Sequence, residues 1–205
     1  MNKVKYGLEK VHVAFVADEG WEEPRHIPGA VNLTMNPEGS ENTFYADNTK
    51  YWVETSNNGY SGTLELALVP DDVLAEMLGW EIDEGTGMLI EVANGRPKEF
   101  ALLGQVLGDT RNRRFVYYRC VASRPADNAA TKTESVAPNT DTLNITVLPI
   151  EHDKKKIVKS VLERDETDET NAAIFDAWFD EVTLPGASGG ESGASGGESG
   201  ASGGE

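Results

Sequence analysis

The chain has 205 residues and a formal net charge of −17, from 35 acidic and 18 basic residues. A body this acidic repels nucleic acid, so the composition argues against a protein that grips DNA through its phosphates. The lone Cys120 excludes an internal disulfide framework, and no apolar run is long enough to span a bilayer. No charged-then-apolar leader opens the sequence, so we expect synthesis in a reducing cytoplasm.

Residues 186–205 differ from the rest because they repeat GASGGES and contain only Gly, Ala, Ser and Glu. Such a segment has no apolar surface to bury, and we expect a flexible tail. Residues 1–185 are long enough for one large domain or two small ones, and we assign them to one domain. A body of that size buries about 70% of its unfolded surface and needs no crosslink to fold.

Apolar and polar residues alternate with period two through most of the body, which is typical of half-buried strands. We expect strands near 31–35, 51–55, 88–92, 100–107 and 156–162. The predicted core faces are Val11, Val13 and Phe15; Leu64, Leu66 and Leu68; Val116, Tyr118, Cys120 and Ala122; and Leu143, Ile145 and Val147. The number and spacing of these strands predict a mainly β fold, a sandwich or a barrel.

Two turn signals lie between the early strands. Asn57, Asn58 and Gly59 accept the positive φ values of a tight turn, so we predict a hairpin that joins the strands on either side. Residues 36–39, NPEG, predict a second turn at the head of a polar extension over 36–48. We hypothesise that this hairpin and extension reach a neighbouring subunit, with an ordinary intramolecular hairpin as an equally supported alternative.

Helix signals occur twice. Pro70, Asp71 and Asp72 predict a helix start, and Gly79 predicts its end. A second helix is expected from about Asp168 to Glu181. The fold class is therefore mainly β with one or two flanking helices.

The run from residue 100 to 107 is apolar on both faces, so both faces need cover, from a helix of the same chain or from a neighbouring subunit. Phe115 and Tyr117 fall on the expected solvent side of their strand, opposite the core face, and raise the same question.

Catalytic and metal signatures are not found. His12, His26 and His152 are too scattered in sequence for a metal-ligand spacing, and no GxSxG or HExxH pattern occurs in residues 1–185. The acidic run 165–169 is better explained as the approach to a helix N-terminus than as a calcium site. The basic run 154–156 is expected to pair with the acidic surface of another copy rather than with DNA. We therefore predict no catalytic residue, no metal, no cofactor and no enzymatic activity.

A series of motifs nevertheless resembles a known family. FYADN, SNNGYSGTLELALVPDD, KEFALLGQV, YYRCVASRP and AAIFDAWFDEV occur in this order, after the opening KVKYGLEKVHVAFV. The series resembles the phi13-type major tail protein (tail tube protein) family of long-tailed, non-contractile phages, the siphophages. The resemblance covers residues 1–185, and the GASGGES repeat is not part of the family pattern.

The resemblance implies a β-sandwich or barrel-like tail-tube fold that assembles into hexameric rings, and the rings stack into a tube. Viral DNA would pass through the lumen without specific binding. The implied partners are further copies of the chain, the tape-measure protein, the tail terminator, and distal tail or baseplate proteins. The implied location is the virion, after assembly in the host cytoplasm, with no membrane.

From the residues and this resemblance we select candidate assembly-interface residues: Tyr45, Asn58, Gly59, Tyr60, Phe115 and Tyr117. One alternative function is a tube protein of a contractile injection or type VI secretion-like system, which shares the ring architecture inside a sheath. A carbohydrate-binding β-sandwich module is a further alternative, and an enzyme has no motif in its support.

Overall fold

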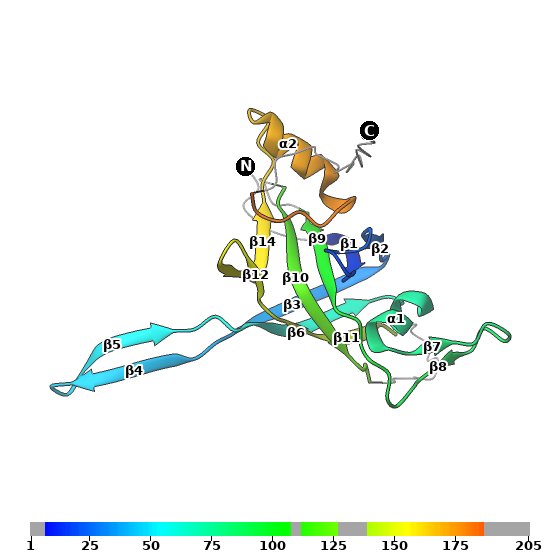
Figure 1. The fold of residues 1–205 in the computed structure, drawn as a ribbon, viewed down its shortest axis with the longest axis horizontal. Helices are drawn as coiled ribbons and strands as arrows, with labels where there is room; N and C mark the ends of the chain where they lie inside the picture. The colour runs from blue at the N-terminus through cyan, green and yellow to red at the C-terminus, as the bar shows by residue number, and fades with distance from the viewer. Residues whose placement is uncertain (1–6, 108–111, 127–138, 187–205) are drawn as a thin grey trace, which may run out of the picture.

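The computed structural model describes residues 7–107, 112–126 and 139–186 (Figure 1). Its centre is one eight-stranded antiparallel sheet in the order β2-β1-β9-β10-β11-β6-β3, with β14 pairing with β10 off this path. The strands are β1 (Leu8–Phe15), β2 (Arg25–His26), β3 (Ala30–Glu38), β6 (Gly59–Leu66), β9 (Phe100–Val106), β10 (Arg114–Ser123), β11 (Asp141–Val147) and β14 (Lys159–Leu162).

Three two-stranded ribbons and two helices complete the described part. The ribbons are β4 (Glu41–Ala46) with β5 (Thr49–Thr55), β7 (Glu81–Ile82) with β8 (Leu89–Ile90), and β12 (Ile150–His152) with β13 (Lys155–Ile157). The helices are α1 (Asp71–Leu78) and α2 (Glu169–Asp176), and a 3-10 turn, η1 (Ala177–Phe179), follows α2. The predicted mainly β fold with flanking helices is confirmed. No helix within the described ranges is long and apolar enough to cross a membrane.

The main core lies on the side of the sheet that α1 closes. β1 and β3 lie against each other without pairing, so the sheet curls around this core. The alternation of Val11, Val13 and Phe15 points all three into it, as predicted. Leu64 and Leu66 are also buried there, but Leu68 is 70% exposed because β6 ends at Leu66.

A second, smaller core lies on the other side of the sheet, under α2 and η1. Alternate residues of β9 serve the two cores: Leu102 belongs to the main core, whereas Ala101 and Leu103 pack near Trp178 of η1. The second cover of this apolar strand is therefore a helix of the same chain, one of the two alternatives left open by the sequence. Trp178 also donates its indole N–H to the Phe115 carbonyl, at 3.4 Å.

The faces of β10 differ from the prediction. Phe115 and Tyr117 point into the main core, and Val116 and Tyr118 into the second one. The pairing of β10 with β9 shifts register between Tyr117 and Cys120, so that Cys120 returns to the face of Tyr117. The expectation of one continuous core face through residues 116, 118, 120 and 122 is wrong, because such a shift reverses a period-two pattern.

The helix boundaries follow their local signals. Gly79 ends α1 in the left-handed region at φ 70°. Asp168 caps α2 by accepting hydrogen bonds from the N–H groups of Thr170 and Asn171, at 2.9 and 3.2 Å. α2 ends at Asp176, and the 3-10 turn η1 continues the helical segment only to Phe179. The second helix is therefore shorter than expected.

Both predicted early turns are wrong. β5 pairs with β4 and not with β6, so residues 57–59 do not close a hairpin between the flanking strands. The two-residue turn is instead Asp47–Asn48, where φ is 49° and 59°. Pro37 lies within β3, opposite Tyr60 of β6, and not in a turn. β3 is an edge strand, where the N–H that proline lacks is not needed.

Two other strands are shorter than predicted. Only Leu89–Ile90 of the expected strand at 88–92 is extended, and the expected strand at 156–162 divides into β13 and β14. The GASGGES repeat beyond Gly186 lies outside the described residues.

Candidate assembly surfaces

One ribbon projects from the body. β4, the Asp47–Asn48 turn and β5, which together we call the arm (residues 41–55), extend away from the main sheet at the left of Figure 1. Every residue of β5 is exposed. Because a two-stranded ribbon without a cover is marginally stable in water, the arm is an unusual element for an isolated subunit.

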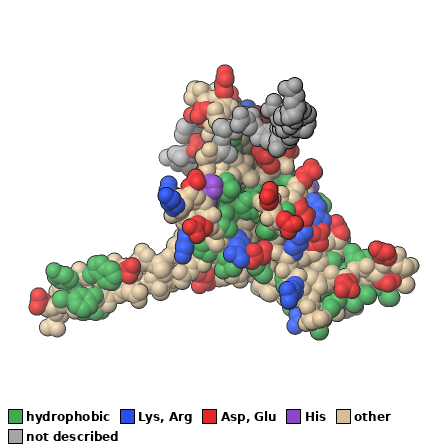
Figure 2. All heavy atoms as spheres, in the orientation of Figure 1, with side chains coloured by type: hydrophobic (Ala, Val, Ile, Leu, Met, Phe, Trp, Pro, Cys, Tyr) green, Lys and Arg blue, Asp and Glu red, His purple; other side chains and the backbone are tan. Residues whose placement is uncertain are grey.

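The arm exposes a group of large apolar side chains. Their exposed fractions run from 45% for Val53 to 74% for Tyr51. Figure 2 shows hydrophobic side chains gathered at the end of the arm. A contiguous apolar surface of this kind marks a site of protein contact. The group is Phe44, Tyr45, Tyr51, Trp52 and Val53.

Hydrogen bonds join residues 38–40 to residues 56–58 where the arm leaves the sheet, a region that we call the root of the arm. The N–H of Ser56 donates to the Ser40 carbonyl, and the N–H of Ser40 donates to the Ser56 hydroxyl, both at 2.9 Å. The N–H of Asn58 donates to the Glu38 carbonyl at 2.8 Å. The arm is therefore continuous with β3 and β6, and its two strands leave the sheet together.

The six residues predicted from the sequence fall in three settings. Tyr45 is exposed on the arm, and Asn58 is exposed at its root. Gly59 is buried with φ 112°, and Tyr60 is half-buried. No contact with another subunit is present to test these four, and their assembly role stays a prediction.

The structure corrects the prediction for Phe115 and Tyr117. They are only 8% and 4% exposed, so the spare apolar surface expected of them does not exist in the folded subunit. They instead form an aromatic cluster with Tyr60, whose ring centroid lies 5.5 Å from that of Tyr117. Lys159 donates to the Tyr117 hydroxyl at 3.1 Å. Burial raises the pKa of Tyr117 to about 12, so its hydroxyl stays protonated at neutral pH.

Sequence reasoning missed the residues that do form the apolar surface of the arm. The sequence places Phe44 in the polar extension over 36–48 and Tyr51, Trp52 and Val53 in a strand near 51–55, and it predicts no exposed apolar surface for either segment. The available signal was that apolar residues occupy both faces of a short, turn-bounded segment, as in a strand that needs cover on both sides.

Two grooves lie at the other end of the body, near α1, β7 and β8. One has a volume of about 780 Å³, and its lining includes Leu78, Trp80, Val92, Pro97, Val121 and Arg124. The other has a volume of about 470 Å³ and contains Trp80, Leu74 and Leu89. Trp80 lines both grooves. α1, β7 and β8 lie at the opposite end of the molecule from the arm (Figure 1).

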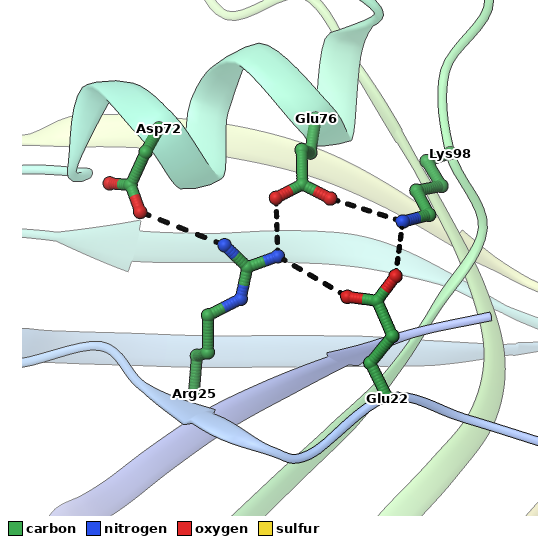
Figure 3. Close-up of polar contacts among 5 residues, drawn as sticks. All are labelled: Glu22, Arg25, Asp72, Glu76 and Lys98. Carbon is green, nitrogen blue, oxygen red and sulfur yellow. Dashed lines mark hydrogen bonds and ion pairs between the residues drawn. The ribbon is translucent and has the colours of Figure 1, made fainter. Parts of the chain in front are cut away.

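An ion-pair network fastens α1 to the sheet (Figure 3). Arg25 contacts Asp72 and Glu76 of α1 and Glu22, while Lys98 bridges Glu22 and Glu76 at 2.5 and 3.1 Å. Burial acts to raise the pKa of Glu76, but the hydrogen bonds from Arg25 and Lys98 outweigh it and lower the pKa. The network therefore supports the body of the fold and does not present a free charged site.

The described residues contain no group of three or more His, Cys, Asp or Glu arranged to hold a metal ion. The Cys120 thiol is completely buried, which raises its pKa and makes it a poor nucleophile.

No family model and no curated protein matches the chain. Among solved structures, one similar chain comes from the cryo-EM structure of the anti-feeding prophage baseplate, 6-fold symmetrised. It is 13% identical, the match covers 80% of this chain and 98% of that chain, and the TM-score is 0.42. Similarity at this level identifies neither a family nor a function.

Proposed function

We propose that the chain is a structural subunit of a tail tube, the major tail protein of a long-tailed, non-contractile phage. The observation that carries the proposal is the arm, whose aromatic side chains are left exposed by the part of the chain that the structure describes. The ordered motifs that resemble phi13-type major tail proteins support the same assignment. In this role the chain forms hexameric rings, and the rings stack into a conduit for viral DNA.

The arrangement of surfaces suits repeated head-to-tail contact. The arm leaves one end of the body, and α1 and β8 lie toward the other (Figure 1). Leu74 of α1 and Leu89 of β8 line one of the grooves beside Trp80. A contact between two different surfaces of identical subunits closes into a ring or continues as a filament. The main sheet also ends in two edge strands, β2 and β3, whose unpaired backbone groups can pair with a neighbouring sheet.

The acidic composition fits a conduit. A net charge of −17 keeps DNA from adhering to the protein, so that the polymer passes without specific binding. The expected partners are copies of the chain, the tape-measure protein, the tail terminator, and distal tail or baseplate proteins. The protein acts in the virion, after assembly in the host cytoplasm, and not as an enzyme.

A tube protein of a contractile injection system would use the same kind of arm. The two functions differ in what surrounds the tube, because only the contractile system has a sheath. Particles from the source of the protein therefore separate them: electron microscopy shows a bare tube in one case and a sheathed tube in the other. A carbohydrate-binding module would instead remain monomeric and bind glycans.

The test removes the apolar surface of the arm without changing the body. We expect Tyr51→Ser combined with Trp52→Ser to abolish rings and tubes in negative-stain images, with an unchanged circular dichroism spectrum. The matched control is Leu68→Ser combined with Met88→Ser, which removes two similarly exposed apolar side chains outside the arm. Normal tubes from the arm variant, or a wild-type protein that is monomeric at every concentration and salt level, would contradict the proposal.

A further inference from the structure

The pairing of β1 with β2 brings together two histidines that the sequence separates by fourteen positions. His12 and His26 are directly opposite each other in this antiparallel pair. The N–H of Ile27 donates to the Val11 carbonyl at 2.8 Å, so the adjacent pair, His12 with His26, is of the non-hydrogen-bonded kind. Side chains of such pairs approach most closely. The two histidines are therefore far apart in the sequence but adjacent in the fold.

The ring of His12 is held in place on two sides. Phe179 of η1 stacks on it with centroids 4.6 Å apart and an interplanar angle of 25°. Its Nδ1 lies 2.9 Å from the Lys10 carbonyl oxygen. A carbonyl can only accept, so Nδ1 carries the proton and Nε2 carries the free lone pair. A histidine that donates one ring N–H to a backbone carbonyl and offers the other nitrogen is the usual arrangement of a metal ligand.

The separation of the two rings also fits the binding of both imidazoles to one metal ion. The centroids of His12 and His26 are 4.9 Å apart. For metal–nitrogen bonds of about 2.1 Å and ligand angles of about 90–109°, two imidazole centroids bound to one ion stand about 4.5–5.3 Å apart. The two rings therefore already have the spacing of neighbouring ligands.

We propose that His12 and His26 form a two-histidine site for a divalent ion that favours imidazole, such as Zn²⁺, Ni²⁺ or Cu²⁺. Water fills the remaining positions, because no third ligating side chain joins the pair among the described residues. A bound ion would link the short edge strand β2 to β1 and strengthen this end of the sheet.

Two charged side chains of opposite sign, Lys10 and Asp180, lie near His12. The Lys10 ammonium also lies over the Phe179 ring, 5.9 Å from its centroid.

Calorimetric titration of the full chain with Ni²⁺ alone at pH 7.5 tests the proposal. We expect one ion per chain, and at least about tenfold weaker binding after His12→Gln or His26→Gln. His26 is exposed, so its variant leaves the Phe179 contact and the fold intact. His152→Gln is the matched control, because that residue lies on β12 and contacts the Pro185 carbonyl.

The outcomes are distinct. Site-specific loss in the first two variants with wild-type binding in the control supports the site. Unchanged binding in the His26 variant, equal loss in all three variants, or absence of saturable binding by the wild type overturns it. None of these results depends on whether the chain assembles into tubes.

Discussion

At Gly59 the backbone enters the main sheet from the arm with φ 112°, and a Cβ there would stand 1.9 Å from the Val147 carbonyl oxygen. Glycine is needed here for two independent reasons, the positive φ and the close approach of β11. The residue is thus explained by the fold of the single subunit, and a change at Gly59 would not report on assembly alone.

Gly59→Ala is expected to lower the free energy of unfolding by about 3 kcal/mol, because the added methyl group meets backbone that cannot move aside cheaply. Urea denaturation measures this loss. Gly87→Ala is the control, since φ there is 71° but nothing lies within 4 Å of a Cβ. It should lose only about 1–2 kcal/mol. Equal losses would show that the clash with Val147 is relieved by a small shift.

Glu76 is the carboxylate on which the α1 network converges, and its side chain is 34% exposed. Glu76→Gln should lower the free energy of unfolding at pH 7 by about 1 kcal/mol, after allowance for solvent screening. The lowered pKa of Glu76 means that its contribution is present above the unfolded-state pKa and is lost as pH falls through the folded-state pKa.

The difference between wild type and Glu76→Gln should therefore shrink as the pH falls below about 4.5, as urea titrations at several pH values would show. Glu84→Gln, an exposed change in the loop between β7 and β8, is the comparison and should have little effect at any pH. A constant difference down to pH 2 would exclude the charge of Glu76 as the cause.

At the scale of elements, the arm shows how far local sequence signals extend. By sequence Asn58–Gly59 is the stronger signal for a tight turn, yet the two-residue turn forms at Asp47–Asn48. The choice is made by distant partners: β6 pairs with β3 on one side and β11 on the other, which leaves β5 only β4. The sequence therefore predicts that turns and strands exist here, but not which strands are joined.

The same limit applies to the candidate site. The pattern of β1, β11 and α1 identifies most of their buried residues because one periodicity runs through each element. In β10 a single register shift after Tyr117 exchanges the faces, and period-two reading places Phe115 and Tyr117 outside. The apolar surface of the arm was missed because burial depends on cover, which the residues of a strand do not encode.

Hydrogen exchange should distinguish the arm from the sheet. In the monomer we expect the amides of β5 to exchange within seconds, because no layer covers the ribbon, while those of β9 exchange orders of magnitude more slowly. In assembled tubes the arm should gain protection and β9 should change little. Arm amides as protected as β9 in the monomer would show that the ribbon is stable without a partner.

At the scale of the whole molecule, the net negative charge determines how the protein interacts with DNA. The net charge of −17 should prevent binding of duplex DNA at 150 mM salt, measured by fluorescence anisotropy with a labelled duplex. A variant with Lys154, Lys155 and Lys156 changed to Gln serves as the comparison and should behave identically. If the wild type binds the duplex and the variant does not, the β12–β13 turn contacts DNA. That result would contradict the proposal of a conduit to which DNA does not adhere.

The length of the arm has a consequence for how two such molecules meet. Six or seven residues per strand at about 3.4 Å each carry its aromatic tip about 20 Å beyond the sheet. Electrostatic repulsion between acidic bodies fades over about 8 Å at physiological ionic strength. The tip of the arm can therefore contact another subunit while the two acidic bodies are still separated by more than the screening length. The repulsion between them then slows association less than a net charge of −17 on each subunit would suggest.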